Sequence, residues 1–536
     1  MAAPKETSSR TQYLWPIFTV LVIFVYFFGL NVPLLGPDEP RYAQVAREMF
    51  ERGDWITTTL GGFQWFEKPA LLYWYQIAAY HVFGVNEFAA RFGSALSGLG
   101  TILSLWMLAR FSGLPNALNS PNFPNRLALI AAASVGLIVF SRGASFDIIL
   151  TFPITAAMSA FFISDSRERA GKSSLLPLII FYIFVGVSLL AKGLVGIVFP
   201  FAIVGFYFVL MRRIPSAKFL FSVVWGTLLA AVVAAAWYLP MYLVNGWEFI
   251  DEFFIQHHFQ RYTSNKYLHP QPFYFFFFVL PLMTLPWLPF FVAKLWQMLR
   301  RLFSKRNTED AELKFSPAEV FAFAWLAVPL VFFSFSGSKL PGYILPALPP
   351  CLMLAAMCVD KFIGENLRRV ALIRAAAVAT LVIVVGLVIF ALPRYAETDS
   401  VKSLIAAAAE KGFANEKVAG LHTVSHNAEF YAAGRLIREP DGKQRRFDGT
   451  FEILEQMQKT GEQSILILVP SEKLADALLQ KNLRLELIKD NGETAILICT
   501  TGAPSIPTGA ASIPACQRPT DAKNSPLLRT FSGIRR

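Results

Sequence analysis

Long uncharged stretches separated by short charged segments make up most of this chain. A helix that crosses the hydrocarbon layer of a membrane needs about 17–25 mainly apolar residues. Runs without Asp, Glu, Lys or Arg occupy roughly 13–35, 92–109, 148–164, 174–191, 193–211, 219–247, 271–293, 320–338, 340–359 and 375–393, and a shorter run covers 127–141. The pattern predicts an α-helical polytopic membrane protein with eleven spans. The first span is expected to be retained, because no small-residue cleavage site follows it.

Composition agrees with a membrane location, and charge predicts the orientation. Of the 536 residues, 54% are hydrophobic and only 16% are charged, which is too few charges to cover a water-soluble protein of this size. With the N-terminus inside, twenty Lys and Arg residues fall in the inner segments, as the positive-inside rule requires. This asymmetry largely explains the net charge of +12 without a nucleic-acid partner. Eleven spans leave the chain outside after about residue 393.

Three regions follow from this topology: a transmembrane domain over 1–393, an external domain over 394–500 and a tail over 501–536. A long external loop at 36–91 contains two helical patterns, DEPRYAQVAREMFERG and PALLYWYQIAAYHVFG, which suit helices lying in the membrane interface. In the external domain, the helical pattern KLADALLQKN accompanies the strand-like segments VAGLHT, SILILVP, LRLELI and AILICT, which together predict a small α/β domain. The tail, rich in Pro, Ser, Ala and Thr, is predicted to be disordered. Cys499 and Cys516 are both external, where a disulfide and two free thiols are equally compatible with the sequence.

Ionisable residues are nearly absent from the spans and concentrate at their external ends. This distribution argues against a proton pump or ion-coupled transporter, whose charged groups lie near the bilayer centre. Lys and Arg orient phosphate oxygens, a carboxylate acts as a general base or stabilises a developing cation, and a carboxylate with an imidazole holds a metal. The set therefore suits transfer of a phosphate-linked group at the membrane surface. Its members are Asp38, Glu39, Arg41, Glu67, Lys68, Arg142, Asp147, Lys192, His257, His258, Arg261, Lys339 and Tyr343.

Most of these residues also have a purely structural interpretation. Asp38 is a candidate N-cap of the helix that follows it, and the lysines at two span ends are candidates for snorkelling to the interface. Glu67 and Lys68 are adjacent and suit a surface ion pair that contributes little to stability. Asp147 is harder to explain in this way, because a carboxylate between two apolar spans is costly unless it is paired.

Seven short strings carry a resemblance that covers roughly residues 15–360. They are PDEPRYAQVAREMFERGDW, FEKPALLYW, VFGVNEFAARFGSAL, AKGLVGIVFP, HHFQRY, LPWLPF and SGSKLPGYILPALPP. In their order and approximate spacing the chain resembles polyprenyl-phosphate-dependent glycosyltransferases of the lipid A aminoarabinose transferase type, which are related to protein O-mannosyltransferases. The resemblance implies a GT-C fold with about 11–13 transmembrane helices. It also implies an inner-membrane enzyme that moves a sugar from a polyprenyl phosphate carrier to lipid A or lipopolysaccharide at the periplasmic face.

The resemblance further implies roles for the residues at matching positions. Asp38 and Asp147 match two important aspartates and are the expected catalytic residues. The residues expected to bind the donor phosphate are Lys68, Arg261, Lys192, Tyr343 and Arg41, with support from Tyr42 and Lys339. The resemblance implies a divalent metal, zinc or magnesium, held by Glu67 and His258, and no nucleotide cofactor is expected.

The predicted reaction is direct displacement at the anomeric carbon, with polyprenyl phosphate as the leaving group. Asp38 orients the donor if the acceptor is an ionised lipid A phosphate, and acts as a general base if the acceptor is a hydroxyl. Close aminoarabinose transferases tend to have Thr at Pro40 and Ala191 and Glu at His257, so the sugar and the acceptor stay open. The alternatives are a galacturonic acid or other hexose transferase acting on the lipopolysaccharide core or lipid A, and a protein O-mannosyltransferase. A lipid or sugar flippase is disfavoured, since the spans show neither ionisable residues nor an alternating-access repeat.

Overall fold

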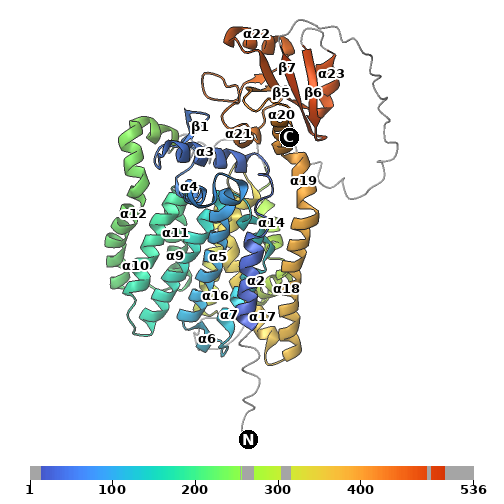
Figure 1. Cartoon of the computed structure of the whole chain (residues 1–536). Helices are drawn as coiled ribbons and strands as arrows, with labels where there is room; N and C mark the ends of the chain where they lie inside the picture. Colours follow the sequence, from blue (N-terminus) through green and yellow to red (C-terminus); the bar gives the residue numbers. More distant parts are fainter. Residues whose placement is uncertain (1–13, 254, 256–270, 304–314, 480–483, 501–536) are drawn as a thin grey trace.

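The computed structural model describes residues 14–253, 255, 271–303, 315–479 and 484–500. A bundle of helices carries a small sheet domain at one end (Figure 1). The helices of the bundle are α2 (Leu14–Phe27), α5 (Glu87–Phe111), α6 (Leu114–Ala117), α7 (Phe123–Ala132), α8 (Val135–Ser141), α9 (Phe146–Arg169), α10 (Leu175–Lys192), α11 (Val195–Leu210), α12 (Ala217–Ile250), α14 (Phe275–Met283), α15 (Leu288–Phe303), α16 (Pro317–Ser334), η3 (Pro341–Ala347), α17 (Leu348–Ile363) and α18 (Leu367–Phe390).

Each of the eleven apolar runs predicted as a span falls on helical structure. Among the described residues, seven helices are long and apolar enough to cross a membrane by themselves, and α7 and α8 reach this length only together, with a bend of 58° between them. The helices α2 and α11 are apolar but shorter, and the run at 271–293 is divided between α14 and α15. The prediction of a multi-pass helical membrane protein is therefore confirmed.

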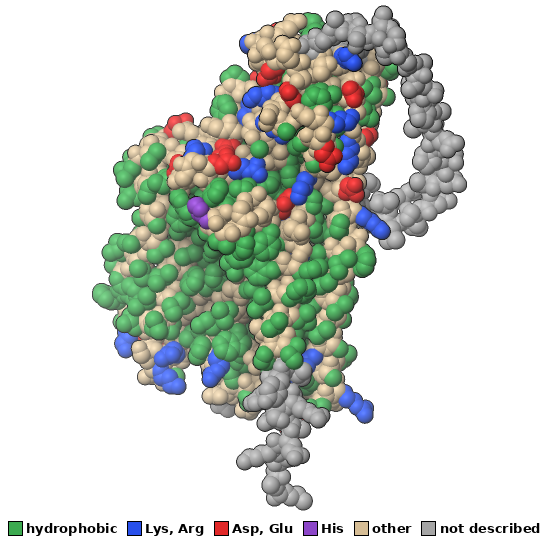
Figure 2. Space-filling view, viewed as in Figure 1, with side chains coloured by type: hydrophobic (Ala, Val, Ile, Leu, Met, Phe, Trp, Pro, Cys, Tyr) green, Lys and Arg blue, Asp and Glu red, His purple; other side chains and the backbone are tan. Residues whose placement is uncertain are grey.

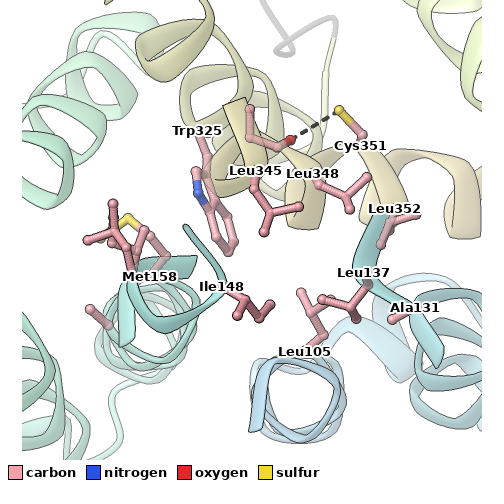
Figure 3. Packing of buried hydrophobic residues seen from close by; sticks show 14 of the residues in the cluster. Leu105, Ala131, Leu137, Ile148, Met158, Trp325, Leu345, Leu348, Cys351 and Leu352 are labelled. Carbon is pink, nitrogen blue, oxygen red and sulfur yellow. Dashed lines mark hydrogen bonds between the residues drawn. The ribbon is translucent and has the colours of Figure 1, made fainter. Parts of the chain in front are cut away.

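The centre of the bundle is formed by α9 and α17. In their most apolar stretches 89% and 94% of residues are buried within the protein, compared with 28% for α12 and 22% for α18, which lie at the periphery. Figure 3 shows side chains of this core, in which Ile148 and Met158 of α9 lie among residues of α5, α7, α8, α16 and α17. The N-terminal end of α9, which carries Asp147, is thus held by packing on several sides.

The external loop folds into two helices and a hairpin at the domain-bearing end of the bundle. The helices are α3 (Asp38–Arg52) and α4 (Leu71–Phe83), and the hairpin strands are β1 (Thr59–Leu60) and β2 (Phe63–Gln64). The predicted stop at Gly53 is confirmed, because this residue has φ 65° and ends α3 in the left-handed region that favours glycine. The predicted N-cap role of Asp38 is wrong. Pro37 occupies the cap position without a side-chain cap bond, and Asp38 is already the first helical residue.

The external domain is a five-stranded mixed sheet in the order β4-β3-β5-β7-β6. Its strands are β3 (Val418–Leu421), β4 (Arg446–Phe447), β5 (Ser464–Pro470), β6 (Arg484–Asp490) and β7 (Thr494–Thr500), and its helices are α19 (Leu392–Asp399), α20 (Lys402–Glu410), α21 (Ala428–Tyr431), α22 (Thr450–Thr460), η4 (Ser471–Lys473) and α23 (Leu474–Leu478). The four predicted strands are confirmed, whereas β4 was not predicted. Two apolar clusters cover opposite faces of β5 and β7, which explains their continuous burial. Cys499 is buried in β7, and the tail with Cys516 lies outside the described residues.

The two ends of the molecule differ in charge. In the view of Figure 2, a broad hydrophobic belt separates a mixed acidic and basic region around the external domain from a cluster of Lys and Arg side chains at the opposite end. At that opposite end, Asp360 pairs with Arg126, and Glu319 pairs with Lys294. The excess of basic groups on one side agrees with the orientation predicted from the loops.

Candidate active site

A cavity of about 460 Å³ lies at the end of the bundle that carries the external loop and domain. Seven of the residues selected from the sequence line it together: Asp38, Glu39, Glu67, Lys68, Asp147, Lys192 and Tyr343. Tyr42, expected in a supporting role, also lines it. Residues more than 300 positions apart in the chain thus lie in one site. The topology inferred from the sequence predicted only that they lie on the same side of the membrane.

Asp38 and Arg41 form an ion pair on the first turn of α3. The Arg41 guanidinium binds Asp38 Oδ1, donates from Nε to the Pro37 carbonyl at 3.0 Å and lies over the Trp65 ring at 5.9 Å. Positions three apart share one face of a helix, so this pairing follows directly from the sequence spacing. The Asp38 side chain is 45% exposed and faces the cavity, while Arg41 lies beside the cavity rather than in its wall. A reactant in the cavity can therefore reach the Asp38 carboxylate.

Glu67 and Lys68 form a second ion pair in the cavity wall. Lys68 Nζ lies 2.6 Å from Glu67 Oε1, and both side chains are about nine-tenths buried. The sequence suggested a surface ion pair that contributes little to stability, and this interpretation is wrong because the pair is buried. Charges removed from solvent are screened far less than exposed ones. The pair places an ammonium and a carboxylate on the same wall.

Asp147 and Lys192 form the third pair, between the first turn of α9 and the last turn of α10. Lys192 Nζ also lies 4.7 Å from the centre of the Tyr343 ring. The positive charge of Lys192 offsets the free-energy cost of placing the Asp147 carboxylate between apolar spans. Lys192 therefore points to Asp147 and does not snorkel to the interface. Gly342 packs against this pair so closely that a Cβ atom built on it would overlap Asp147 Oδ2. Glycine at 342 therefore fixes how near η3 approaches the aspartate.

Glu39, which the sequence-based selection contained, forms a structural clamp with Arg91, which the selection missed. Arg91 of α5 binds both Glu39 carboxylate oxygens, at 3.2 and 2.6 Å, and donates to the carbonyls of Leu30, Val32 and Pro33. Glu39 also accepts the Leu35 and Ala144 backbone N–H groups at 2.9 and 2.7 Å. The clamp joins the segment after α2, the start of α3 and the turn before α9, so it holds the segments that carry both aspartates. An arginine in the otherwise apolar run at 88–109 was the signal available in the sequence.

The rest of the cavity wall is largely apolar. Leu194, Val195 and Val198 at the start of α11 face the cavity, together with Phe332 and Phe333 at the end of α16. These segments belong to the membrane-embedded bundle. The cavity thus has an ionic part, built by the three pairs, and an apolar part of the kind that receives a hydrocarbon chain.

Known proteins share both the sequence pattern and the architecture. The family described as "Dolichyl-phosphate-mannose-protein mannosyltransferase" matches residues 17–254. A protein of Aeromonas salmonicida named "Undecaprenyl phosphate-alpha-4-amino-4-deoxy-L-arabinose arabinosyl transferase" is 30% identical over 67% of this chain and 62% of its own length. A protein of the same name from Aeromonas hydrophila is 31% identical with the same coverage. The chain is thus similar to these glycosyltransferases over 67% of its length.

Solved structures show the same GT-C fold. The crystal structure of ArnT from Cupriavidus metallidurans bound to undecaprenyl phosphate has a TM-score of 0.72 and 22% identity, and covers 91% of this chain and 98% of that one. The oligosaccharyltransferase of Archaeoglobus fulgidus has a TM-score of 0.53 and 12% identity, and covers 88% of this chain and 71% of that one. The aligned region spans about 62% of the length of the Aeromonas relatives. The resemblance and the fold class predicted from the ordered motifs are confirmed.

Three family-derived expectations concern residues away from this cavity wall. Lys339 is buried and donates to the carbonyls of Ser336 and Gln271 at 2.6 and 2.9 Å, so it braces the loop before η3 rather than snorkelling. His258 and Arg261 lie outside the described residues, as does the neighbouring His257. Within the described ranges no group of three or more His, Cys, Asp or Glu side chains suits a metal ion, and Glu67 is engaged by Lys68. A metal held by Glu67 and His258 stays a prediction.

Proposed function

We propose that this protein transfers a sugar of the aminoarabinose type from a polyprenyl phosphate carrier to lipid A or lipopolysaccharide. The observation that supports this proposal best is the composition of the cavity. Its ionic part carries the lysine ammonium groups of Lys68 and Lys192, which suit a phosphate, and its apolar part suits the lipid chain attached to that phosphate. The names of the relatives, with undecaprenyl phosphate as the sugar carrier, point to the same donor class.

The reaction is a displacement at the anomeric carbon. An oxygen of the acceptor forms the new bond to that carbon, and the bond from the carbon to the carrier phosphate breaks with its electron pair passing to the phosphate oxygen. Lys68 and Lys192 stabilise the charge that grows on the leaving phosphate, and Tyr343 holds the Lys192 ammonium through its ring face. Arg261 is proposed as a further phosphate ligand from its sequence position alone.

The role of Asp38 depends on the acceptor. A lipid A phosphate is already ionised near neutral pH, so Asp38 then orients the sugar or stabilises positive charge at the anomeric carbon. A hydroxyl acceptor has to lose its proton, and the exposed Asp38 carboxylate is the group positioned to take it. Tyr42 beside it stays a neutral phenol, because burial and the negative charges of Asp38 and Glu67 raise its pKa well above the ordinary value.

The site is proposed to act at the periplasmic face of the inner membrane. The positive-inside rule puts the basic end of the bundle in the cytoplasm, and the cavity lies at the opposite end with the external domain. A polyprenyl phosphate donor and a lipid acceptor both reside in the membrane, so a cavity at the membrane surface gives access to both.

Mass spectrometry of lipid A and core from a strain lacking this protein tests the proposal. The expected result is loss of an aminopentose mass, restored by the wild-type gene and not by a gene encoding Asp38→Asn. A missing uronic acid or neutral hexose would instead name a different sugar within the same reaction class. Unchanged lipid A and core would contradict the proposed acceptor, and the protein fraction should then be searched for missing O-linked mannose.

A further inference from the structure

One short segment of the external domain, residues 425–431, contacts α3 and the residues that precede it. Arg47 of α3 donates to the Phe430 carbonyl at 2.7 Å and stacks over the Phe430 ring at 4.0 Å. Tyr431 accepts the Leu34 N–H at 2.8 Å and donates to Glu87 at 3.1 Å. The segment is therefore anchored both to α3 and to the turn that precedes it.

One further anchor places the start of this segment near the cavity. The Asn427 side chain donates to the Asp399 carbonyl at 3.1 Å and to the Gly36 carbonyl at 3.5 Å. Gly36 stands two residues before Asp38, and Asp399 in turn accepts the Gly36 N–H at 2.8 Å. His426, next to Asn427, is consequently fixed beside the first turn of α3.

The electrostatic surroundings of His426 agree with this position. Its side chain is exposed, while desolvation by the surrounding protein and the positive charge of Arg41 lower the pKa of its imidazole to about 4 against the opposite effect of Asp38. The imidazole is thus neutral near pH 7 and offers one N–H donor and one nitrogen acceptor. It is an accessible hydrogen-bonding group beside the Asp38–Arg41 pair, and it comes from a different domain.

We propose that His426 contacts the acceptor, so that the external domain contributes a side chain to the transfer site. This inference rests on the proposed function and deepens it. Lys68 and Lys192 line the cavity and are assigned to the donor phosphate, whereas His426 comes from the external domain and interacts electrostatically with Arg41 and Asp38 on the first turn of α3. A neutral imidazole there donates to an acceptor phosphate or accepts from an acceptor hydroxyl.

Steady-state kinetics of the purified full-length protein test the inference, with a polyprenyl-phosphate-linked aminoarabinose donor and lipid A. His426→Asn should raise the KM for lipid A about tenfold, as expected for one lost hydrogen bond, and leave the KM for the donor within about twofold. His426→Gln, which keeps a hydrogen-bonding group at a similar reach, should restore part of the affinity. His422→Asn is the matched control in the same domain, because His422 has φ 57°, where Asn is well tolerated, and it should behave as wild type.

The outcomes separate this inference from the function on which it rests. No transfer by the wild-type protein would overturn both. Transfer by the wild-type protein with an unchanged lipid A KM in His426→Asn would overturn the inference alone. An equal rise in the KM for donor and acceptor would also overturn it, because that result would show displacement of the whole domain rather than loss of one contact.

Discussion

Replacing Arg91 by methionine tests whether the Glu39–Arg91 clamp holds the site together. The change keeps much of the side-chain volume and removes the guanidinium. Glu39 would then keep its two backbone N–H donors but lose its charged partner, and three carbonyls in the segment after α2 would lose their donor. We expect both the start of α3 and the turn before α9 to shift, and transfer to fall.

The burial of the Arg91–Glu39 pair determines how much unfolding free energy the Arg91→Met change should cost. The Arg91 and Glu39 side chains are only 4% and 14% exposed, and removing one partner of a buried pair costs about 3–5 kcal/mol because the other charge is left uncompensated. An exposed pair is worth only about 0–1 kcal/mol. Lys411 and Glu486 of the external domain form such a pair, 45% and 69% exposed at 3.5 Å, so Lys411→Met is the matched control.

The free energy of unfolding in mixed micelles titrated with sodium dodecyl sulfate measures both variants. Arg91→Met should lose several kcal/mol and Lys411→Met at most about 1 kcal/mol. Adding Glu39→Gln to Arg91→Met should not destabilise further, because it removes the uncompensated buried charge and keeps an oxygen that accepts from the backbone. The clamp would be refuted if Arg91→Met and Lys411→Met were equally stable, or if Arg91→Met kept full transfer activity.

Three further predictions concern the cavity wall. Asp147→Asn and Lys192→Met should each reduce the initial rate of transfer. The double variant should be no slower than the less active single variant, because the two groups act as a pair. Additive losses in the initial rate would contradict this. Gly342→Ala should abolish transfer in a folded protein by displacing the Asp147 carboxylate, whereas Gly205→Ala, where a Cβ atom meets nothing within 4 Å, should be silent; equal activity of the two would refute the packing argument. Lys68→Met should raise the KM for the donor roughly 10–150-fold, matching about 1.5–3 kcal/mol for a charged hydrogen bond, and a donor titration with an unchanged KM would remove Lys68 from the phosphate site.

The fold was predictable where the physical signal is local. Uncharged runs of span length locate the membrane helices, and strand-like runs such as 464–470 locate the core of the external sheet. The two-residue strand β4 was not predictable, because such a short segment carries no periodicity and forms only by pairing with β3. The two-residue strands of the β1–β2 hairpin in the external loop were missed for the same reason.

The site was predictable as a set of residues but not as a set of pairs. Topology and motif order predicted that Asp38 and Asp147 lie on the same side of the membrane. They did not predict that Asp38 pairs with Arg41 and Asp147 with Lys192. Asp38 and Glu39 are adjacent in the sequence and both line the cavity, and only the fold distinguishes them. Glu39 is held by Arg91 and two backbone amides and is 14% exposed, while Asp38 pairs with Arg41 and is 45% exposed. His426 lies almost 390 residues away from Asp38, and no local pattern links the two.

The central claim, that this cavity transfers a carrier-linked sugar with Asp38 at the reacting end, is tested most directly by the transfer rate of Asp38→Asn. The assay uses purified protein, a polyprenyl-phosphate-linked aminoarabinose and lipid A, with Glu51→Gln on the exposed far end of α3 as the control. The account predicts wild-type turnover for Glu51→Gln and a loss of about 100-fold or more for Asp38→Asn. Turnover of Asp38→Asn at the wild-type rate, in protein that is folded and inserted normally, would contradict it.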